Sequence, residues 1–378
     1  MKVLLVTPQF APAPGGASVD FGIYAKYLAE MEDDVEDIVV LTGRWPGAPL
    51  IETLSDGRVK VYRILPHISG GHSRMGWIVR EMMRVPISLA ITFLVGAFKG
   101  SDIVHVHKTR SYGGAVVAGR LLGLPVVGDV RDLFDLDIFK YSTMFVVCAK
   151  AGLEKLKNDG IAEERMIYLP VPFEMEPDVD DSTYEEMRNG TLGKASYIIY
   201  VGDMSDAKGV PELLKGIEAL RKKEKEWKDL HLVLCGRDVM DENLRGRLHR
   251  SDDTHYIEQC THAQVMGLMK HAEVVILPSK WEIFGRTCIE GVILGRKVVF
   301  PGCVPEYREM GGPFVLSEIT PSAISKALDD ALRAGKGPDY PLERHDARKV
   351  CKDLLGVYNR LLDIKPKKGH RSKVKNHQ

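Results

Sequence analysis

The stretch that decides the fold is Glu282-Ile-Phe-Gly-Arg-Thr-Cys-Ile-Glu290, in which two glutamates flank an aromatic–glycine step. An apolar run at residues 274–277 precedes it and stops at a Pro-Ser pair, which predicts a buried parallel strand. Residues 286–294 predict a helix. Glu282 is therefore expected in the loop at the carboxyl end of a strand, and Glu290 about one turn inside the helix that follows.

The start of that helix is suited to binding an anion. Its first free backbone amides belong to Phe284, Gly285, Arg286 and Thr287. Such amides point away from the helix, and the helix dipole favours negative charge in front of them. The two glutamates beside them can accept hydrogen bonds from hydroxyl groups. This combination predicts a ligand that carries both phosphate and hydroxyls, as a nucleotide sugar does.

Length and composition narrow the class of protein. The chain of 378 residues exceeds the usual size of one hydrophobic core, so two domains are expected. The formal net charge is zero, which argues against a dedicated nucleic-acid-binding protein because such proteins carry a basic excess. The six cysteines are scattered without a C-x-x-C pair and predict buried side chains in a reducing compartment, the cytoplasm. Residues 1–6 predict a first strand rather than a signal peptide.

The pattern of strands and helices runs through the first half of the chain and then restarts. Apolar, β-branched strands separated by helices predict a doubly wound parallel sheet in each half. We expect an N-terminal domain over residues 1–172, an acidic linker over 173–195 and a C-terminal domain over 196–345. A periodic helix over 346–364 and a basic, disordered tail over 365–378 complete the expected organisation.

A glycine-containing loop follows the first strand of each half. The first is Pro12-Ala13-Pro14-Gly15-Gly16, and the second is Gly202-Asp-Met-Ser-Asp-Ala-Lys208-Gly209. Glycine lets a backbone adopt positive φ and approach a ligand closely, and loops at the carboxyl ends of parallel strands open on the cleft. The spacing of these glycines does not match the dinucleotide motif G-x-G-x-x-G, which disfavours a dehydrogenase.

The segment from Glu282 to Glu290 resembles the E-x7-E signature of retaining glycosyltransferases with two Rossmann-like domains, the GT-B architecture, and in particular glycosyltransferase family 4. The Gly15-Gly16 loop is similar to the family's glycine loop, which closes over the donor phosphates and the acceptor. Residues 202–209 resemble the family's Gly-Arg-Leu-x-x-Glu-Lys-Gly segment, in which Lys208 and Gly209 match.

The resemblance implies a retaining, hexosyltransferase-type enzyme that moves a sugar from a nucleoside-diphosphate sugar to a glycan or lipid-linked acceptor. It implies that Glu290 holds the ribose hydroxyls, that Glu282 holds hydroxyls of the donor sugar, and that Lys208 neutralises the departing diphosphate. The amides of residues 284–287 would hold the phosphates. The architecture requires no metal and no further cofactor.

Two further site residues follow from the resemblance. Residues 102–107 look like the family's strand that ends in a histidine near the cleft, so His107 is expected to bind substrate. Arg131 occupies the position at which many relatives place a histidine beside the donor sugar. His105 and His107 face the same side of their strand, but no partner lies at the spacing of a metal motif.

The second loop also departs from the family pattern. Asp203 stands where an arginine is usual, so a bidentate donor to the diphosphate is missing, and Arg237 or Arg286 would have to replace it. Asp135-Leu-Asp137 mimics the Asp-x-Asp metal motif of the other main glycosyltransferase fold. That triplet is discounted, because such triplets arise readily by chance.

Two other functions use the same site. A nucleotide-sugar epimerase would bind the nucleotide and work without an acceptor. A non-catalytic nucleotide-sugar-binding protein is the second alternative, and it draws support from Asp203 and Arg131 at positions usually occupied by other residues.

Two segments suggest contact with a membrane. The apolar stretch at residues 85–98 is too short to span a bilayer, and it predicts either a buried helix or an amphipathic helix in the lipid interface. The basic tail could add weak, salt-sensitive attraction to anionic lipid. Weak peripheral association with the inner membrane face is the resulting expectation.

Overall fold

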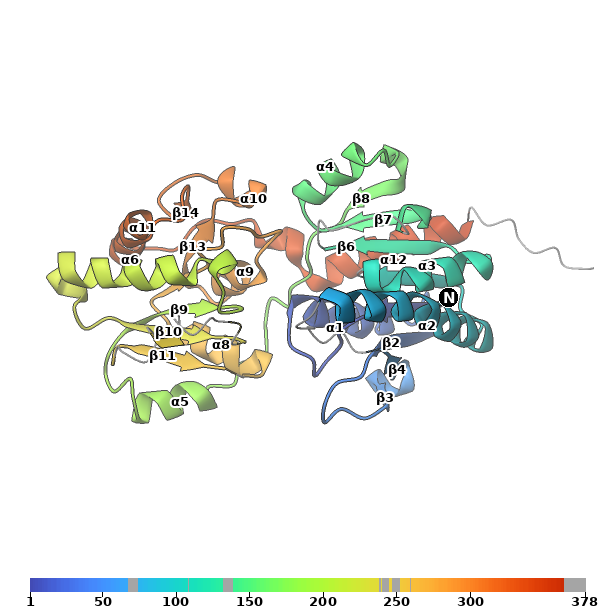
Figure 1. Ribbon diagram of the computed structural model, residues 1–378, viewed down its shortest axis with the longest axis horizontal. Coiled ribbons are helices and arrows are strands. Elements are labelled where there is room, and N and C mark those ends of the chain that lie inside the picture. Colours follow the sequence, from blue (N-terminus) through green and yellow to red (C-terminus); the bar gives the residue numbers. More distant parts are fainter. Residues whose placement is uncertain are drawn as a thin grey trace, which may run out of the picture.

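The computed structural model describes residues 1–66, 74–107, 109–131, 139–237, 239, 245–246, 252–258 and 260–363. These residues form two domains that lie side by side, each with a central sheet and helices on both faces (Figure 1). The expected fold of two parallel-sheet α/β domains is therefore confirmed. The tail, and Asp135 and Asp137, lie outside the described residues.

The N-terminal domain has an eight-stranded sheet in the order β3-β4-β2-β1-β5-β6-β7-β8. Its strands are β1 (Lys2–Thr7), β2 (Asp37–Gly43), β3 (Ile51–Leu54), β4 (Val59–Leu65), β5 (Ile103–His107), β6 (Val126–Val130), β7 (Met144–Val147) and β8 (Met166–Tyr168). Its helices are α1 (Gly16–Ala29), α2 (Arg74–Lys99), α3 (Thr109–Leu121) and α4 (Lys150–Asn158). Only the edge strand β3 pairs antiparallel among the described strands. Alternate residues of β1 enter the cores on opposite faces of the sheet, as the period of two requires.

The C-terminal domain has a six-stranded parallel sheet in the order β11-β10-β9-β12-β13-β14. Its strands are β9 (Tyr197–Val201), β10 (His231–Cys235), β11 (Thr254–Ile257), β12 (Val274–Ile276), β13 (Lys297–Pro301) and β14 (Val315–Leu316). Its helices are α5 (Ser182–Asn189), α6 (Val210–Lys223), α8 (His262–His271), α9 (Arg286–Ile293), α10 (Pro305–Arg308) and α11 (Pro321–Arg333). The strand–loop–helix predicted around the two glutamates is β12, its loop and α9.

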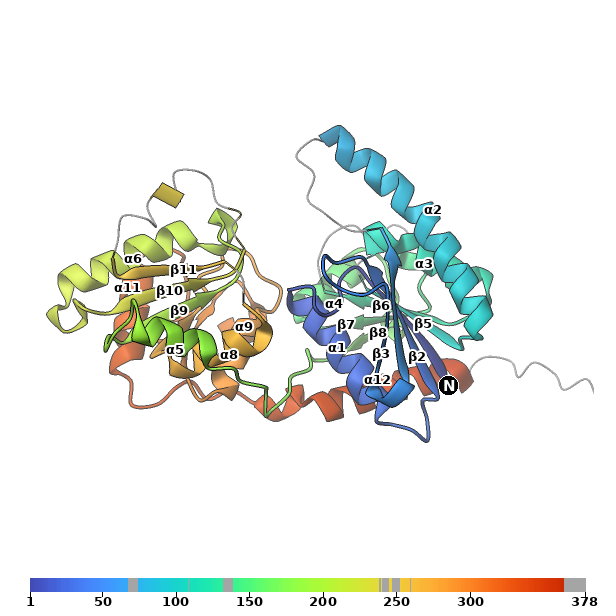
Figure 2. The ribbon, with the colours of Figure 1, turned by 90° about the horizontal axis from the view of Figure 1, so that it is seen from below.

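The last helix returns to the first domain. Helix α12 (Ala347–Asp363) runs from the C-terminal domain along the N-terminal one (Figure 2). Its apolar face packs in the same core as α1 and β1, and the Tyr358 hydroxyl lies 2.5 Å from Nδ1 of His105. The periodicity of this helix was predictable, but its partner was not.

The chain crosses between the domains twice, and the two crossings are hydrogen-bonded to each other. The Phe173 amide donates to the His345 carbonyl at 2.8 Å, and the Ala347 amide donates to the Phe173 carbonyl at 2.9 Å. Burial lowers the pKa of His345 to about 4. The imidazole is therefore neutral near pH 7, and its Nδ1 lies 2.8 Å from the Val171 carbonyl. This pairing brings α1 of the first domain close to α8 and α9 of the second.

The acidic stretch expected as a linker contains helix α5, which is fastened to α8. Asp181 pairs with Lys270 at 2.7 Å and with His271 at 3.1 Å.

In the described part of the chain, no helix combines the length and the apolarity needed to cross a bilayer.

Candidate active site

Glycine shapes the loop between β12 and α9. Gly285 precedes the helix with φ of 77°, and a Cβ on it would lie 2.6 Å from the Leu277 side chain. A side chain at this position would therefore be both strained and crowded. Phe284 is buried against Phe173 and Tyr307, which holds the loop in place. The start of α9 is thus set by a turn that only glycine accommodates well.

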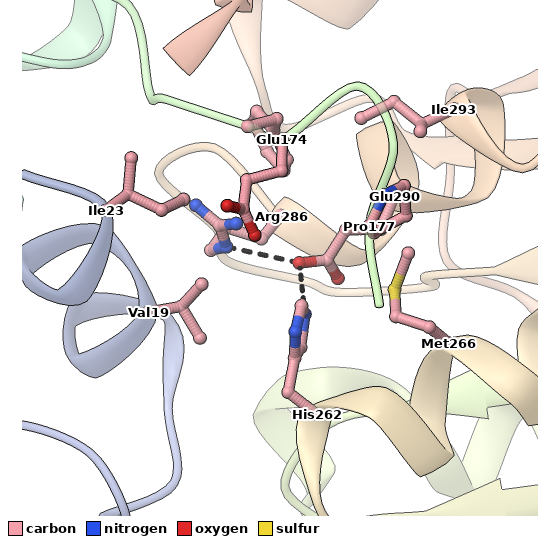
Figure 3. A pocket seen from close by; sticks show the side chains of 10 residues that line it. Val19, Ile23, Glu174, Pro177, His262, Met266, Arg286, Glu290 and Ile293 are labelled. Carbon is pink, nitrogen blue, oxygen red and sulfur yellow. Dashed lines mark hydrogen bonds and ion pairs between the residues drawn. The ribbon is translucent and has the colours of Figure 1, made fainter. Parts of the chain in front are cut away.

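Glu290 lies in α9 beneath this loop, where it forms a buried ionic contact. Its Oε1 accepts a hydrogen bond from Arg286 Nε at 3.3 Å and lies 3.0 Å from His262 Nε2 (Figure 3). Burial would raise the pKa of Glu290, but the charge of Arg286 and the hydrogen bond from His262 outweigh it and hold the pKa at about 2. Glu290 is therefore an anionic acceptor near pH 7.

A pocket surrounds this carboxylate at the junction of the domains. Its walls come from α1, from the first crossing segment around Phe173, and from α8 and α9 (Figure 3). The lining residues are Val19, Ile23, Phe173, Glu174, Pro177, His262, Met266, Arg286, Glu290 and Ile293. Apolar side chains beside a few convergent polar groups are typical of small-ligand sites.

Glu282 and Lys208 meet across two loops of the C-terminal domain. Lys208 Nζ lies 2.5 Å from Glu282 Oε2. The backbones of these two loops pack closely beside this contact. A Cβ on Gly209 would lie 2.0 Å from the Pro278 carbonyl oxygen, so only glycine fits there. Gly209 has φ of 70° and directly precedes α6. The structure thus brings together two residues that the sequence assigned to the same donor.

The loop that begins at Gly202 is contacted by an arginine from the end of the neighbouring strand β10. Arg237 follows β10 and donates to both carboxylate oxygens of Asp203, at 2.9 and 2.7 Å. Gly236 allows this approach, since a Cβ there would lie 2.0 Å from the Gly202 carbonyl oxygen. A guanidinium therefore lies beside the position where the family's arginine is expected, although it comes from a different element.

Asp20 in α1 joins the two domains, a contact that no sequence pattern predicted. Both Arg131, from the end of β6, and Arg286, from α9, donate to its carboxylate. Arg286 also donates to the Pro172 carbonyl at 3.0 Å and lies over the Phe173 ring, 4.1 Å from its centre. The available signal was an acidic residue between Val19 and Phe21, two apolar residues, close after the Gly15-Gly16 loop.

Gly15 and Gly16 bring the first-domain loop to this junction. Gly15 has φ of 120° at the start of α1. A Cβ on Gly16 would lie 2.9 Å from the Arg286 side chain, so the small residue leaves room for that arginine. Thr287 is anchored by its hydroxyl, which donates to the Val201 carbonyl at 3.3 Å.

Arg131 and His107 both lie inside the first domain. Arg131 Nε is 2.8 Å from Asp129 Oδ1, and Arg131 also donates to Tyr24 at 2.7 Å. His107 is buried, 3.2 Å from the Thr7 hydroxyl, and its ring stacks on Phe21. In this structure both side chains are occupied by protein partners.

The two histidines of β5 share one face, as predicted. His105 and His107 both contact the Phe21 ring. His105 Nε2 also lies 3.3 Å from Asp129 Oδ2. Over the described ranges, no group of three or more His, Cys, Asp or Glu residues is arranged to hold a metal ion.

Comparison with known proteins agrees with this arrangement. Residues 184–340 match the family described as glycosyl transferases group 1. The GDP-mannose:cellobiosyl-diphosphopolyprenol alpha-mannosyltransferase of Xanthomonas oryzae pv. oryzae is 24% identical over 312 residues, which cover 78% of this chain and 77% of that protein.

Solved structures share the fold of the whole chain. The UDP-forming trehalose-phosphate synthase of Burkholderia xenovorans has a TM-score of 0.69 at 13% identity, with 96% of this chain and 98% of that chain covered. Anabaena Alr3699/HepE, in complex with UDP and glucose, has a TM-score of 0.66 at 14% identity, with 95% and 100% covered. Residues 184–340 thus match the group 1 glycosyl transferase family, and the chain as a whole has the two-domain GT-B fold of these solved structures.

Proposed function

We propose that the chain is a retaining glycosyltransferase that transfers a hexosyl group from a nucleoside-diphosphate sugar to a glycan or lipid-linked acceptor. The observation that carries this proposal is the ion pair of Lys208 and Glu282 at the loop that leads to the anionic Glu290. One relative is named for GDP-mannose, and one structural neighbour was solved with UDP and glucose. Both names support a nucleotide sugar as the donor, and they differ in base and sugar.

Each group has a defined task in this proposal. Glu290 accepts hydrogen bonds from the ribose, and Glu282 accepts them from the donor sugar. The amides at the start of α9 hold the diphosphate, and Lys208 stabilises the negative charge that develops on it as the glycosidic bond breaks. The protein thus acts by positioning and by preorganised charge. Closure of the two domains excludes water, which would otherwise compete with the acceptor.

The proposed reaction needs no metal ion. Lys208 and the helix N-terminus supply the positive charge that a metal would otherwise bring to the leaving diphosphate. Turnover is therefore expected to persist in excess EDTA. Loss of turnover with EDTA and its recovery with Mg²⁺ or Mn²⁺ would contradict this part of the proposal.

Transfer is distinguished from the two alternative functions by one assay. The chain is incubated with each of a panel of nucleotide sugars, with and without glycan and lipid-linked acceptors, and the products are identified by mass spectrometry. Transfer supports the proposal. An isomerised donor in the absence of acceptor would indicate an epimerase, and tight binding with neither product would indicate a binding protein.

Replacing the two glutamates by alanine should weaken donor use in different ways. Glu290→Ala should lower the affinity for free nucleoside diphosphate about tenfold to a hundredfold, since a hydrogen bond to a charged group contributes about 1.5–3 kcal/mol. Glu282→Ala should leave that affinity nearly unchanged while transfer falls, because its partner is the sugar. Isothermal titration calorimetry and initial rates measure the two effects.

Glu186→Ala is the control for these variants, because Glu186 is an exposed glutamate on α5. It should match the parent in both measurements. If Glu290→Ala binds the nucleotide as the parent does, the ribose assignment is wrong.

We assign the acceptor to the N-terminal domain, which carries exposed apolar side chains suited to peripheral membrane contact. Leu94 and Phe98, near the end of α2, are 67% and 88% exposed, and Leu121, at the end of α3, is also exposed. Apolar side chains of this kind can insert into the lipid interface. We expect weak, salt-sensitive association with the cytoplasmic face of a membrane, and hence with anionic vesicles.

Two variants test the helix and the basic tail separately by co-sedimentation with vesicles: Leu94→Ser/Phe98→Ser for the helix, and a chain ending at Ile364 for the tail. Equal binding to neutral and anionic vesicles would exclude an electrostatic contribution.

A further inference from the structure

The carboxylate of Glu290 is bonded to the protein on one side only. Within the described part of the chain, both hydrogen bonds to it end on Oε1, one from Arg286 and one from His262. No described residue donates to Oε2. Glu290 is only 6% exposed. Oε2 is not among the buried side-chain oxygens that lack a partner in the described residues, so it is accessible to a ligand and can accept a hydrogen bond from one.

The start of α8 positions His262 beside the Glu290 carboxylate. It is the first residue of α8, whose start is fixed by a reciprocal pair of hydrogen bonds between Thr261 and Gln264. The segment before α5 is hydrogen-bonded to the same turn: the Asp180 amide donates to the Ala263 carbonyl at 2.9 Å. These bonds fix the backbone from which the imidazole reaches Glu290.

The His262 side chain also reaches the pocket. It is 42% exposed and lines the pocket together with Met266 and Glu290, and its ring points at the Glu290 carboxylate (Figure 3). Because an ionised carboxylate only accepts hydrogen bonds, the 3.0 Å contact requires that His262 Nε2 carries the proton. The orientation of the carboxylate is thereby determined by two donors from two different helices.

We propose that His262 is a positioning residue for the donor nucleotide: together with Arg286 it holds Oε1 of Glu290, so that Oε2 faces the ribose hydroxyls. This inference rests on the proposed function, because it presumes that the ligand is a nucleotide sugar. It adds a residue outside the two glutamates and the loop between them. It also predicts that His262 contributes to the recognition of ribose rather than of the base or the phosphates.

The test compares ribonucleotides with dideoxynucleotides. Calorimetry measures the affinity of UDP, GDP, ADP and CDP, and of the 2′,3′-dideoxy counterpart of each nucleotide that binds. The parent should prefer the ribonucleotide, and His262→Ala should lose about tenfold in affinity for it. The same variant should bind the dideoxynucleotide as the parent does, because the hydroxyls that Glu290 would hold are absent. His262→Gln, which can still place an N–H near Oε1, should recover part of the preference.

His271→Ala is the matched control, because His271 is the last residue of the same helix. It lies 3.1 Å from Asp181 and stacks on Tyr184, so it fastens α8 to α5 without touching Glu290. It should leave the preference for ribose unchanged. An equal loss of ribonucleotide and dideoxynucleotide affinity in His262→Ala would show that the histidine only supports the fold, and it would overturn the inference.

Glu290→Ala separates failure of the inference from failure of the proposed function. If Glu290→Ala loses the ribose preference and His262→Ala keeps it, only the role of His262 is refuted. If Glu290→Ala also keeps the preference, the ribose site itself is refuted. If the parent binds none of the four nucleoside diphosphates, both proposals are overturned.

Discussion

Replacing Lys208 by methionine should lower kcat/KM for sugar transfer by about 10²–10³-fold. A preorganised positive group aimed at developing negative charge contributes about this much when it is removed from an active site. Methionine keeps much of the length of the side chain and removes the ammonium group, so the backbone of the loop is expected to stay in place. Initial rates with saturating acceptor and varied donor measure the effect.

The matched control is Lys280→Met. Lys280 lies close in sequence to Glu282 but pairs with Asp206 at 2.9 Å and with Glu212 at 3.1 Å. It should lower kcat/KM less than threefold. Equal losses in the two lysine variants would contradict the role of Lys208, as would a loss of less than tenfold in Lys208→Met.

Because Lys208 contacts Glu282, the lysine could act only by orienting the glutamate, and a double variant tests whether it does. If the lysine only orients the glutamate, Lys208→Met should cost nothing more in a Glu282→Gln background. We expect a further loss of at least tenfold there, because in the proposed function the lysine also stabilises the departing diphosphate. The cycle of two single variants and the double variant measures this coupling.

Replacing Asp129 by asparagine should lower the free energy of unfolding of the first domain by about 3–5 kcal/mol at pH 7. Asp129 is fully buried and pairs with Arg131 and His105. Removing this carboxylate breaks a buried ionic network and leaves the Arg131 guanidinium with Asp20 as its remaining carboxylate partner among the described residues, and breaking a buried pair typically has a cost of this size. Urea unfolding followed by tryptophan fluorescence and circular dichroism measures it.

The effect should depend on pH in a defined direction. Burial opposes the ionisation of Asp129, but the charge of Arg131 and the hydrogen bond with His105 outweigh it and hold the pKa of the carboxyl well below its usual range. A carboxyl with a lowered pKa stabilises the folded state above its unfolded pKa of about 3.9, and this stabilisation is lost as the pH falls below that value. The difference between parent and variant should therefore be complete at pH 7 and shrink below about pH 4.

Asp37→Asn is the control for this variant. Asp37 pairs with Lys60 at 3.4 Å in a partly exposed contact. Such surface pairs contribute about 0–1 kcal/mol, so the change should be small. A loss in Asp129→Asn no larger than in this control, or a difference that grows as the pH falls, would contradict the account of the buried network.

The sequence by itself determined the fold class and the strand–loop–helix that carries Glu282 and Glu290. These features are local: an apolar run, a Pro-Ser stop and a glycine that accepts positive φ lie within about twenty residues, and each constrains the backbone directly. The same reasoning placed Lys208 and Gly209 in a loop at the carboxyl end of a strand. The ion pair between Lys208 and Glu282 was expected only as a shared role, because no pattern specifies a side-chain contact.

The tertiary structure alone decided which distant residues surround Glu290. Arg286 meets Asp20 across 266 positions of the chain, and His105 meets Tyr358 across 253. A contact between two residues so far apart leaves no period in either segment, since it depends on how finished helices and sheets pack. For the same reason nothing in the sequence pattern marked His262 as a partner of Glu290. Only when α8 and α9 are packed side by side does its ring become the second donor to the carboxylate.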